Sequence, residues 1–213
     1  MTPRSLDDVA ALLTRRLREP LPGAASQRRF APRPIHEDWS PDQTPDSARR
    51  AAVLLLLYPG LDEVALPLTL RRTTLSAHAG QISLPGGALD AGESVEAAAL
   101  READEEIGVD PATVHLLGTL STLWVSVSNF LVTPVVGVAR EAPAFRLHER
   151  EVDTLIETPV RRLLDPSAVL WSHRQRGSER IDYPYFDIDG HAVWGATAMM
   201  LGEFVDLFEE ARS

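Results

Sequence analysis

The chain has 213 residues, of which 44% are hydrophobic, and it contains no cysteine. This length suits one domain with additions, or at most two small domains, and the composition allows a substantial core. The absence of cysteine excludes disulfides, thiolate metal sites and a cysteine nucleophile. The formal net charge of −10 at pH 7 argues against general nucleic-acid binding, which depends on basic patches, so we expect no nucleic-acid partner. An anionic ligand would need local positive charge, from a bound cation or from a group of arginines.

The N-terminal part of the chain is predicted to contain one helix and one extended segment. Apolar side chains recur at helical spacing over residues 6–18, and Pro20 ends this helix. Residues 19–50 are rich in Pro, Ser, Arg and Asp and have little apolar content, which favours an extended, loosely structured crossing over a linker between domains. We therefore expect residues 1–213 to form a single domain.

The sequence shows no targeting signal and no membrane span. Residues 1–17 lack the apolar region of a signal peptide and carry Asp7 and Asp8. The longest strongly apolar run, residues 51–58, is far shorter than the roughly 20 residues that a membrane span needs. We expect a cytoplasmic protein without a membrane partner, and the oligomeric state is not readable from the sequence.

The rest of the chain is predicted to mix strands and helices. Short apolar runs bounded by turn residues predict strands at 51–58, 64–72, 113–121, 124–127, 130–138, 152–160, 167–173 and 181–188. A short strand and a glycine-rich loop are expected over 80–92, and helices over 94–107, 160–164 and 192–211. The residues of the last helix expected to face the core are Met199, Met200, Phe204 and Leu207. This order predicts an α/β (α+β) fold with helices packed on a mixed sheet.

The predicted helix over 94–107 concentrates carboxylates. Glu102 and Glu106 lie one turn apart on the same face, and Glu105 lies about 60° from Glu102 around the helix axis. Three carboxylates that converge in this way form an oxygen-only set, which suits Mg²⁺ or Mn²⁺ and does not suit zinc or copper. The alternative is a solvated acidic face on which Arg101 pairs with Glu105, four residues later.

The spacing around this helix resembles a known motif. Gly87 is followed after five residues by Glu93, and after seven more by the run READEEIGV at residues 101–109. This arrangement resembles the Nudix box, G-x5-E-x7-R-E-U-x-E-E-x-G-U with U apolar, at every fixed position. The resemblance implies a Nudix-type α/β/α sandwich with a mixed β-sheet and a metal-binding loop–helix–loop. It also implies an enzyme that hydrolyses a nucleoside diphosphate linked to a further group.

The same resemblance assigns roles to individual residues. The ligands for Mg²⁺ or Mn²⁺ would be Glu102, Glu105, Glu106 and the carbonyl oxygen of Gly87. Glu93 and Arg101 would form a salt bridge that fixes the loop against the helix. Glu102, or a glutamate of a later loop, would take the proton of the attacking water. Glu149 and Glu151 are the candidates in such a loop, and Glu151 is either an additional base or metal ligand or a surface charge.

A second motif precedes the box. Residues 68–87, LTLRRTTLSAHAGQISLPGG, resemble the motif that marks coenzyme A pyrophosphatases within the Nudix superfamily, L-L-T-x-R-[SA]-x3-R-x3-G-x3-F-P-G-G. The matching positions are Leu68, Thr69, Arg71, Gly80, Pro85, Gly86 and Gly87, and His78 and Gln81 fit a run common in that family. The departures include Arg72, Ser76 and Leu84. Ser76 stands where the motif has a second arginine, so one bidentate phosphate contact is lost. Residues 193–198, VWGATA, also resemble this subfamily.

The resemblance implies hydrolysis of the pyrophosphate bond of coenzyme A to 3′,5′-ADP and 4′-phosphopantetheine. The expected substrate-binding residues are Arg71, His78 and Gln81, where Arg71 alternatively balances the acidic helix and His78 is alternatively a satisfied loop histidine. Two other functions stay open. One is the same chemistry on ADP-ribose, a dinucleotide or a dinucleoside polyphosphate, and the other is non-catalytic nucleotide binding. The intact set of three carboxylates argues against the latter.

Overall fold

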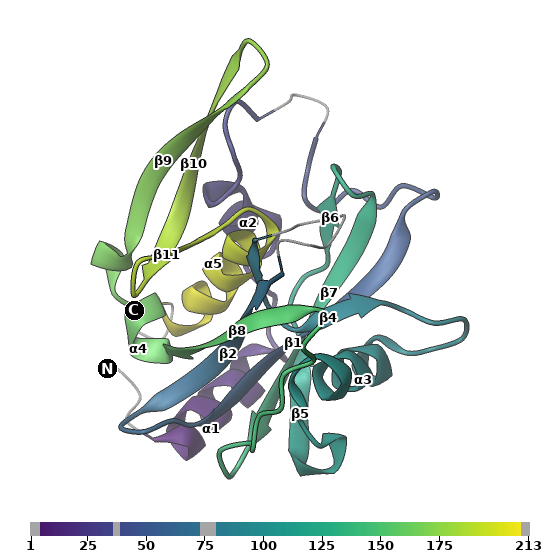
Figure 1. Ribbon diagram of the computed structural model, residues 1–213, viewed down its shortest axis with the longest axis vertical. Helices are drawn as coiled ribbons and strands as arrows, with labels where there is room; N and C mark the ends of the chain where they lie inside the picture. The colour runs from purple at the N-terminus through teal and green to yellow at the C-terminus, as the bar shows by residue number, and fades with distance from the viewer. Residues whose placement is uncertain (1–4, 36–38, 73–79, 210–213) are drawn as a thin grey trace.

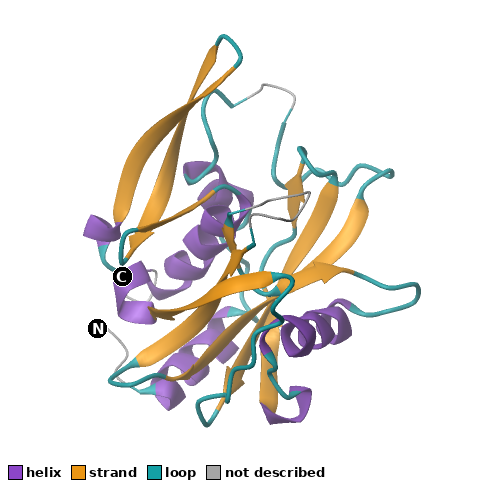
Figure 2. Ribbon diagram, in the orientation of Figure 1, coloured by secondary structure: helices purple, strands orange, loops and turns teal. Residues whose placement is uncertain are grey.

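The computed structural model describes residues 5–35, 39–72 and 80–209, and Figure 1 and Figure 2 show how their elements are arranged. The helices are α1 (Leu6–Arg16), α2 (Ala24–Arg29), α3 (Val95–Ile107), α4 (Val160–Leu163) and α5 (Ala196–Glu209), with 3₁₀ turns η1 (Pro111–Thr113) and η2 (Pro166–Ala168). The strands are β1 (Arg49–Pro59), β2 (Val64–Arg71), β3 (Ile82–Ser83), β4 (Gly86–Ala88), β5 (Val114–Thr119), β6 (Leu123–Val125), β7 (Phe130–Ala139), β8 (Val152–Pro159), β9 (Val169–Arg176), β10 (Glu179–Ile188) and β11 (His191–Trp194). None of the helices within these described ranges is both long enough and apolar enough to cross a membrane.

The central sheet is mixed, as the sequence predicts. Its eight strands include β3, β2, β1, β7 and β5 in that spatial order, with β4, β6 and β8 paired to β1, β7 and β2. β1 runs parallel to β7 and antiparallel to β2 and β4. The predicted strands correspond to β1, β2 and β5 to β10, and the predicted helices over 94–107 and 160–164 to α3 and α4. The α+β fold class is therefore confirmed.

β1 is buried on both faces and sorts its side chains into two cores, because successive residues of a strand point to opposite faces. The residues that pack with α3 are Ala52, Leu54, Leu56 and Tyr58. Those that pack with α1 and α5 are Ala51, Val53, Leu55 and Leu57. Each fully buried leucine contributes on the order of 1.5–3 kcal/mol. The result is three layers, with α3 on one face of the sheet and α1 and α5 on the other, as in the predicted sandwich.

Residues 19–50 differ from the expected extended crossing, because they contain helix α2. The contact between α2 and α5 is polar. The carboxylate of Glu203 in α5 is fully buried, and it accepts hydrogen bonds from the amides of Gly23 and Ser121 at 3.1 and 3.2 Å and from Nε2 of Gln27 at 2.9 Å. Hydrogen bonds of this kind offset the cost of burying a charged group. Apolar periodicity does not predict α2, because the buried side chains of α2, Ser26 and Gln27, are polar.

The prediction for the C-terminal segment is right for the helix and wrong for its start. The core residues of α5 include Met199, Met200, Phe204 and Leu207, as predicted. Residues 192–194, expected to be helical, belong instead to β11, which pairs with β10 and sets Trp194 opposite Tyr185. Gly195, with φ of +66°, then turns the chain into α5. A left-handed backbone at this position ends the strand and separates it from the helix.

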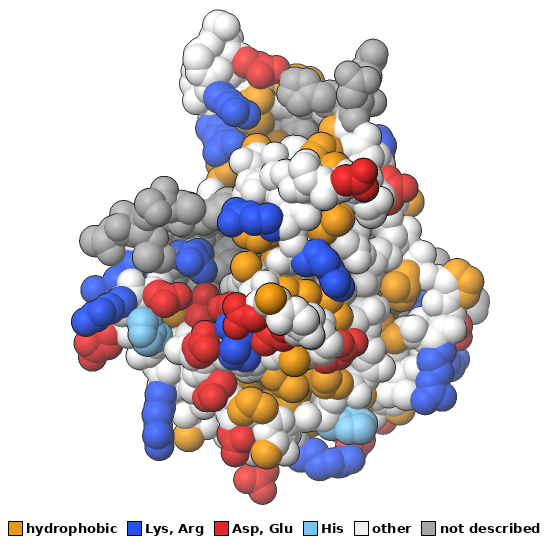
Figure 3. All heavy atoms as spheres, turned by 90° about the vertical axis from the view of Figure 1, so that its right-hand side faces the viewer, with side chains coloured by type: hydrophobic (Ala, Val, Ile, Leu, Met, Phe, Trp, Pro, Cys, Tyr) orange, Lys and Arg blue, Asp and Glu red, His pale blue; other side chains and the backbone are white. Residues whose placement is uncertain are grey.

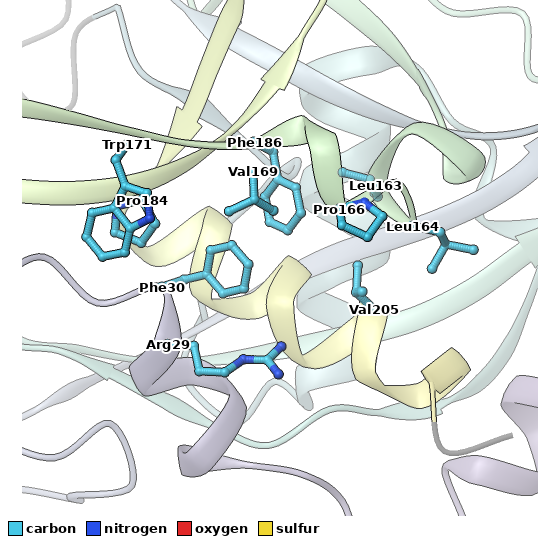
Figure 4. A pocket seen from close by; sticks show the side chains of 10 residues that line it. All are labelled: Arg29, Phe30, Leu163, Leu164, Pro166, Val169, Trp171, Pro184, Phe186 and Val205. Atoms are coloured by element: carbon cyan, nitrogen blue, oxygen red, sulfur yellow. The ribbon is translucent and has the colours of Figure 1, made fainter. Parts of the chain in front are cut away.

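The three-stranded sheet β9–β10–β11 is a projecting hairpin with one added strand (Figure 1). One of its faces packs over α2 and α5. There Phe30, which follows α2, stacks on Phe186 of β10 with ring centroids 4.7 Å apart. Trp171 and Pro184 lie beside this pair and line a cavity of about 310 Å³ together with residues of α4, η2 and α5 (Figure 4). The opposite face of the sheet points away from this core.

Candidate active site

Helix α3 is positioned by its caps and by a set of buried alanines. Oγ of Ser94 accepts a hydrogen bond from the amide of Ala97 at 3.1 Å, and Gly108 ends the helix with φ of +71°. The alanines that pack against the sheet are Ala98, Ala99 and Ala103. Small side chains let the helix approach the sheet closely. This places the charged face of α3 against the loop that carries Gly86 and Gly87.

Arg101 joins the loop to the helix. Its Nε and Nη2 atoms donate to the two carboxylate oxygens of Glu93 at 2.9 and 3.0 Å, and Nη2 also donates to the carbonyl oxygen of Ala88 at 3.1 Å. The guanidinium of Arg101, together with the amide of Asp90, lowers the pKa of Glu93 to about 2. The structure thus brings together the two residues expected to fix the loop. A bidentate pair of this kind sets orientation as well as distance.

Glu106 lies beneath the site and is only 2% exposed. One of its carboxylate oxygens accepts from Nη1 of Arg71 at 3.2 Å, and the other accepts from the amide of Gly86 at 3.2 Å. Burial raises the pKa of Glu106 to about 7, against the lowering effects of Arg71 and the Gly86 amide, and the negative charges of Glu102 and Glu151 raise it further. This carboxylate therefore connects α3 with β2 and β4, and its charged form is unfavourable in the folded chain.

Glu102 and Glu105 both lie beside the same guanidinium. Nη1 of Arg101 is 2.8 Å from Oε1 of Glu102 and 3.2 Å from Oε2 of Glu105. The i,i+4 pair of the alternative interpretation is thus present together with the contact to Glu93. A Cβ atom at Gly87 would lie 2.5 Å from the Glu102 carboxylate, so only glycine permits this approach. On the face shown in Figure 3, acidic side chains gather in one area with basic side chains among and above them.

The donor set fits a divalent cation in its chemistry. The ligands on offer are carboxylate and carbonyl oxygens, which Mg²⁺ and Mn²⁺ prefer. The charges of Glu102 and Glu151 raise the pKa of buried Glu106, and a cation would reverse that repulsion. Within the described ranges, no three Asp, Glu or His side chains already surround one point. In this arrangement Arg101 contacts both Glu102 and Glu105, and a cation held by Glu105 would have to displace its contact with Arg101.

The loop before β8 brings a fourth carboxylate toward the site. The amide of His148 donates to the carbonyl oxygen of Glu106 at 2.9 Å, and the carbonyl oxygen of Glu151 accepts from the amide of Arg72 at 3.0 Å. The Glu151 side chain is 44% exposed and lies 3.5 Å from Nδ1 of His148. Its charge raises the pKa values of Glu102 and Glu106. Glu149, the other glutamate considered in this loop, is exposed.

The expected substrate-binding residues are placed unequally. Arg71 pairs with Glu106, which is the charge-balancing role considered for it. The carbonyl oxygen of Gln81 accepts from the amide of Arg71 at 3.0 Å, so Gln81 lies beside the site through its backbone. His78 and Ser76 lie outside the described residues. Sequence reasoning missed the amide of Gly86 as a hydrogen-bond donor to Glu106. The glycine pair was the signal for a close approach, but it did not identify the partner.

These features define a class of protein in which a loop–helix–loop rich in carboxylates lies on one face of a mixed sheet. A family model described as the NUDIX domain matches residues 48–175. An uncharacterized Nudix hydrolase NudL of Escherichia coli (strain SMS-3-5 / SECEC) is 38% identical over 158 residues, which are 73% of this chain and 80% of that protein. The corresponding protein of Salmonella paratyphi B (strain ATCC BAA-1250 / SPB7) is 37% identical over 73% of this chain and 81% of its own length.

Solved structures show the same likeness over parts of the chain. A Nudix hydrolase from M. smegmatis, RenU, is 27% identical with a TM-score of 0.46, over 54% of this chain and 72% of that chain. The MutT protein from Methanosarcina mazei Go1 is 17% identical with a TM-score of 0.49, over 80% of this chain and 100% of that chain. By its domain match and its relatives, the chain belongs to the Nudix family and is a Nudix hydrolase, an enzyme class that acts on pyrophosphate bonds and generally uses divalent metal cations.

Proposed function

We propose that the chain hydrolyses the pyrophosphate bond of coenzyme A and its derivatives, with Mg²⁺ or Mn²⁺, to 3′,5′-ADP and 4′-phosphopantetheine. The observation that carries this proposal is the contact of Glu106 with Arg71 and with the amide of Gly86. It joins the segment 68–87, which resembles the coenzyme A motif, to the acidic helix of the box. Two separate sequence motifs therefore meet at one carboxylate.

In this proposal the cation is held by Glu102, Glu105, Glu106 and the carbonyl oxygen of Gly87. When bound, it supplies Lewis-acid activation of water and neutralises charge on the diphosphate. Glu106 is fixed by two donors and orients the site. Glu102 or Glu151 takes the proton of the attacking water as a new P–O bond forms on one phosphorus and the P–O bond from that phosphorus to the bridging oxygen breaks, so that the other phosphate leaves with the bridging oxygen. Arg71, which is partly exposed, offers its remaining N–H groups to the phosphates.

The departures from the motif bear differently on the substrate. Leu84 is 1% exposed and packs in the core shared with α5, so the exchange of Phe for Leu there changes packing and leaves the substrate contacts alone. Arg72 is exposed next to the site. Ser76, which stands where the motif has an arginine, is the departure that weakens phosphate binding. Because of this departure, ADP-ribose and dinucleotides stay as alternative substrates.

The test is a digestion of coenzyme A beside one of ADP-ribose, each with Mg²⁺ or Mn²⁺, followed by chromatography of the products. We expect 3′,5′-ADP and 4′-phosphopantetheine from coenzyme A at a higher kcat/KM than any product from ADP-ribose. The Glu106→Gln variant, which keeps the shape of the side chain, serves as the inactive control. If only ADP-ribose is cleaved, ADP-ribose replaces coenzyme A as the proposed substrate. If neither compound is cleaved, non-catalytic nucleotide binding is favoured.

A further inference from the structure

The three-stranded sheet β9–β10–β11 carries a cluster of aromatic rings on the face opposite its core. Tyr183 and Tyr185 alternate along β10 with the buried Pro184 and Phe186, so their rings point away from α5. Trp194 of β11 pairs directly with Tyr185. The ring of Tyr183 lies 4.9 Å from that of Trp194 and 6.4 Å from that of Tyr185, at angles of 38° and 54°. All three side chains are partly exposed.

A cation lies over this aromatic cluster. The guanidinium carbon of Arg174 in β9 is 4.5 Å from the centroid of the Trp194 ring. Arg174 is exposed and rests on the ring of Trp194. An arginine that rests on an aromatic ring keeps its N–H groups available for an anion, because the ring takes up only the flat face of the guanidinium. In a chain of net charge −10, such a group is a local attraction for an anionic ligand.

The aromatic cluster faces the same side of the molecule as Glu106. Val193 of β11 and Ile82 of β3 both belong to the core on the α5 side. Trp194 and Ser83, the next residue in each strand, therefore face the opposite side, where α3 lies. β11 lies against β3. The side chains of Trp194 and Ser83 thus lie on the faces of β11 and β3 that point away from the α5 core.

A series of contacts joins the two places. Oγ1 of Thr197, just after β11, donates to the carbonyl oxygen of Ile82 at 3.0 Å. Ile82 pairs with Leu70 of β2, and the next residue, Arg71, reaches Glu106 at 3.2 Å. β3 therefore lies between β11, which it contacts, and β2, with which it pairs, and it joins the aromatic face to the strand that carries Arg71.

We propose that Tyr183, Trp194 and Arg174 form the site that receives the nucleobase end of the substrate. The flat base stacks on the aromatic face, and Arg174 pairs with an anionic group of the same nucleotide. Aromatic stacking accepts any base, whereas the arginine adds a preference for a phosphorylated one. This inference rests on the proposed function in one respect, namely that the substrate is a nucleoside diphosphate derivative. The hairpin would then select substrates that carry a base.

The experiment measures binding of two probes to the full chain in the absence of metal, by titration followed with NMR. The probes are AMP and ribose 5-phosphate, which differ only in the base. We expect AMP to bind the wild-type chain more tightly, and we expect Trp194→Leu and Tyr183→Leu to weaken AMP binding about 10- to 100-fold. Neither substitution should change the binding of ribose 5-phosphate. Trp171→Ala is the matched control, because Trp171 also lies under an arginine but on the opposite face.

Arg174→Gln covers the case in which the aromatic variants do not fold, since this side chain is exposed. It should lower the affinity for AMP and reduce the dependence of that affinity on salt. Equal binding of AMP and ribose 5-phosphate to the wild-type chain, or wild-type AMP affinity in Trp194→Leu and Arg174→Gln, would overturn the inference. The outcome is separable from the proposed function. If the chain binds AMP as expected but does not cleave coenzyme A, the proposed substrate is wrong and the proposed nucleobase site stands.

Discussion

Glu106 is a buried carboxylate whose charge should destabilise the metal-free fold. Its pKa is about 7 in the folded chain and ordinarily 4.5. Between these two pH values the folded chain holds a proton on Glu106 that the unfolded chain has released. The stabilisation from this protonation is therefore complete below pH 4.5 and is lost as the pH rises through about 7. At about 1.4 kcal/mol per pH unit, the charged side chain costs the folded chain roughly 3 kcal/mol at pH 8.

Glu106→Gln tests this reasoning, because the amide resembles the neutral acid in shape. In the presence of a chelator, the variant should exceed the wild type in free energy of unfolding by about 3 kcal/mol at pH 8 and by less than about 1 kcal/mol at pH 5. Urea denaturation at the two pH values measures both differences. Glu105→Gln is the matched control, because the side chain of Glu105 is 60% exposed, and it should show no such pH dependence.

Metal reverses the comparison in this account. A cation present at 100 times its dissociation constant stabilises the chain that binds it by about 2.7 kcal/mol. Added Mn²⁺ should therefore stabilise the wild type at pH 8 and have little effect on Glu106→Gln. If Glu106→Gln proves no more stable than the wild type at pH 8 without metal, the charge of Glu106 does not destabilise the metal-free fold, and the claim is refuted.

Three further substitutions test the site. Gly87→Ala would place a Cβ atom 2.5 Å from the Glu102 carboxylate, and the displacement should lower kcat about 100-fold; steady-state kinetics with wild-type values would contradict this close approach. Glu93→Gln should speed proteolysis of the loop between β4 and α3, because it weakens the bidentate contact with Arg101. Because the pKa of Glu93 is about 2, the ion pair of Glu93 with Arg101 contributes fully above pH 4.5 and is lost only as the pH falls through about 2. The variant should therefore still be cleaved faster than the wild type at pH 4. Glu151→Gln should lower kcat by about 100- to 10,000-fold and remove the acidic limb of the pH profile if Glu151 is the base, whereas the neighbouring Glu149→Gln should not; equal rates in the two variants would leave Glu102 as the base.

The sequence predicts the acidic helix well because its information is local. The spacing of Gly87, Glu93 and Arg101 identifies the loop and helix, and Ser94 and Gly108 mark the helix ends. The contact between Arg71 and Glu106 could not be predicted in the same way, because it joins residues 35 apart in sequence through the pairing of β2 with its neighbours. Pairing partners depend on the whole sheet, and no local pattern sets β1 parallel to β7.

The failures have physical causes of the same kind. α2 was missed because Gln27 faces inward to a buried carboxylate of α5, 176 residues later. The sequence predicts helix where β11 lies, since Val193 and Trp194 suit either structure and only the pairing with β10 decides between them. The sequence does not predict the aromatic face of the hairpin for a similar reason. Tyr183, Trp194 and Arg174 come from three strands and meet only in the folded sheet.

The central claim is that the carboxylates of α3 bind a divalent cation in order to engage a diphosphate. The most direct measurement is a titration of the chain with Mn²⁺ followed by electron paramagnetic resonance, which detects the free ion. The account predicts that the wild type removes Mn²⁺ from solution, that Glu102→Gln and Glu106→Gln each weaken this binding at least tenfold, and that added coenzyme A strengthens it in the wild type. Binding that is equally strong in the wild type and both variants, or that is undetectable in the wild type, would contradict it.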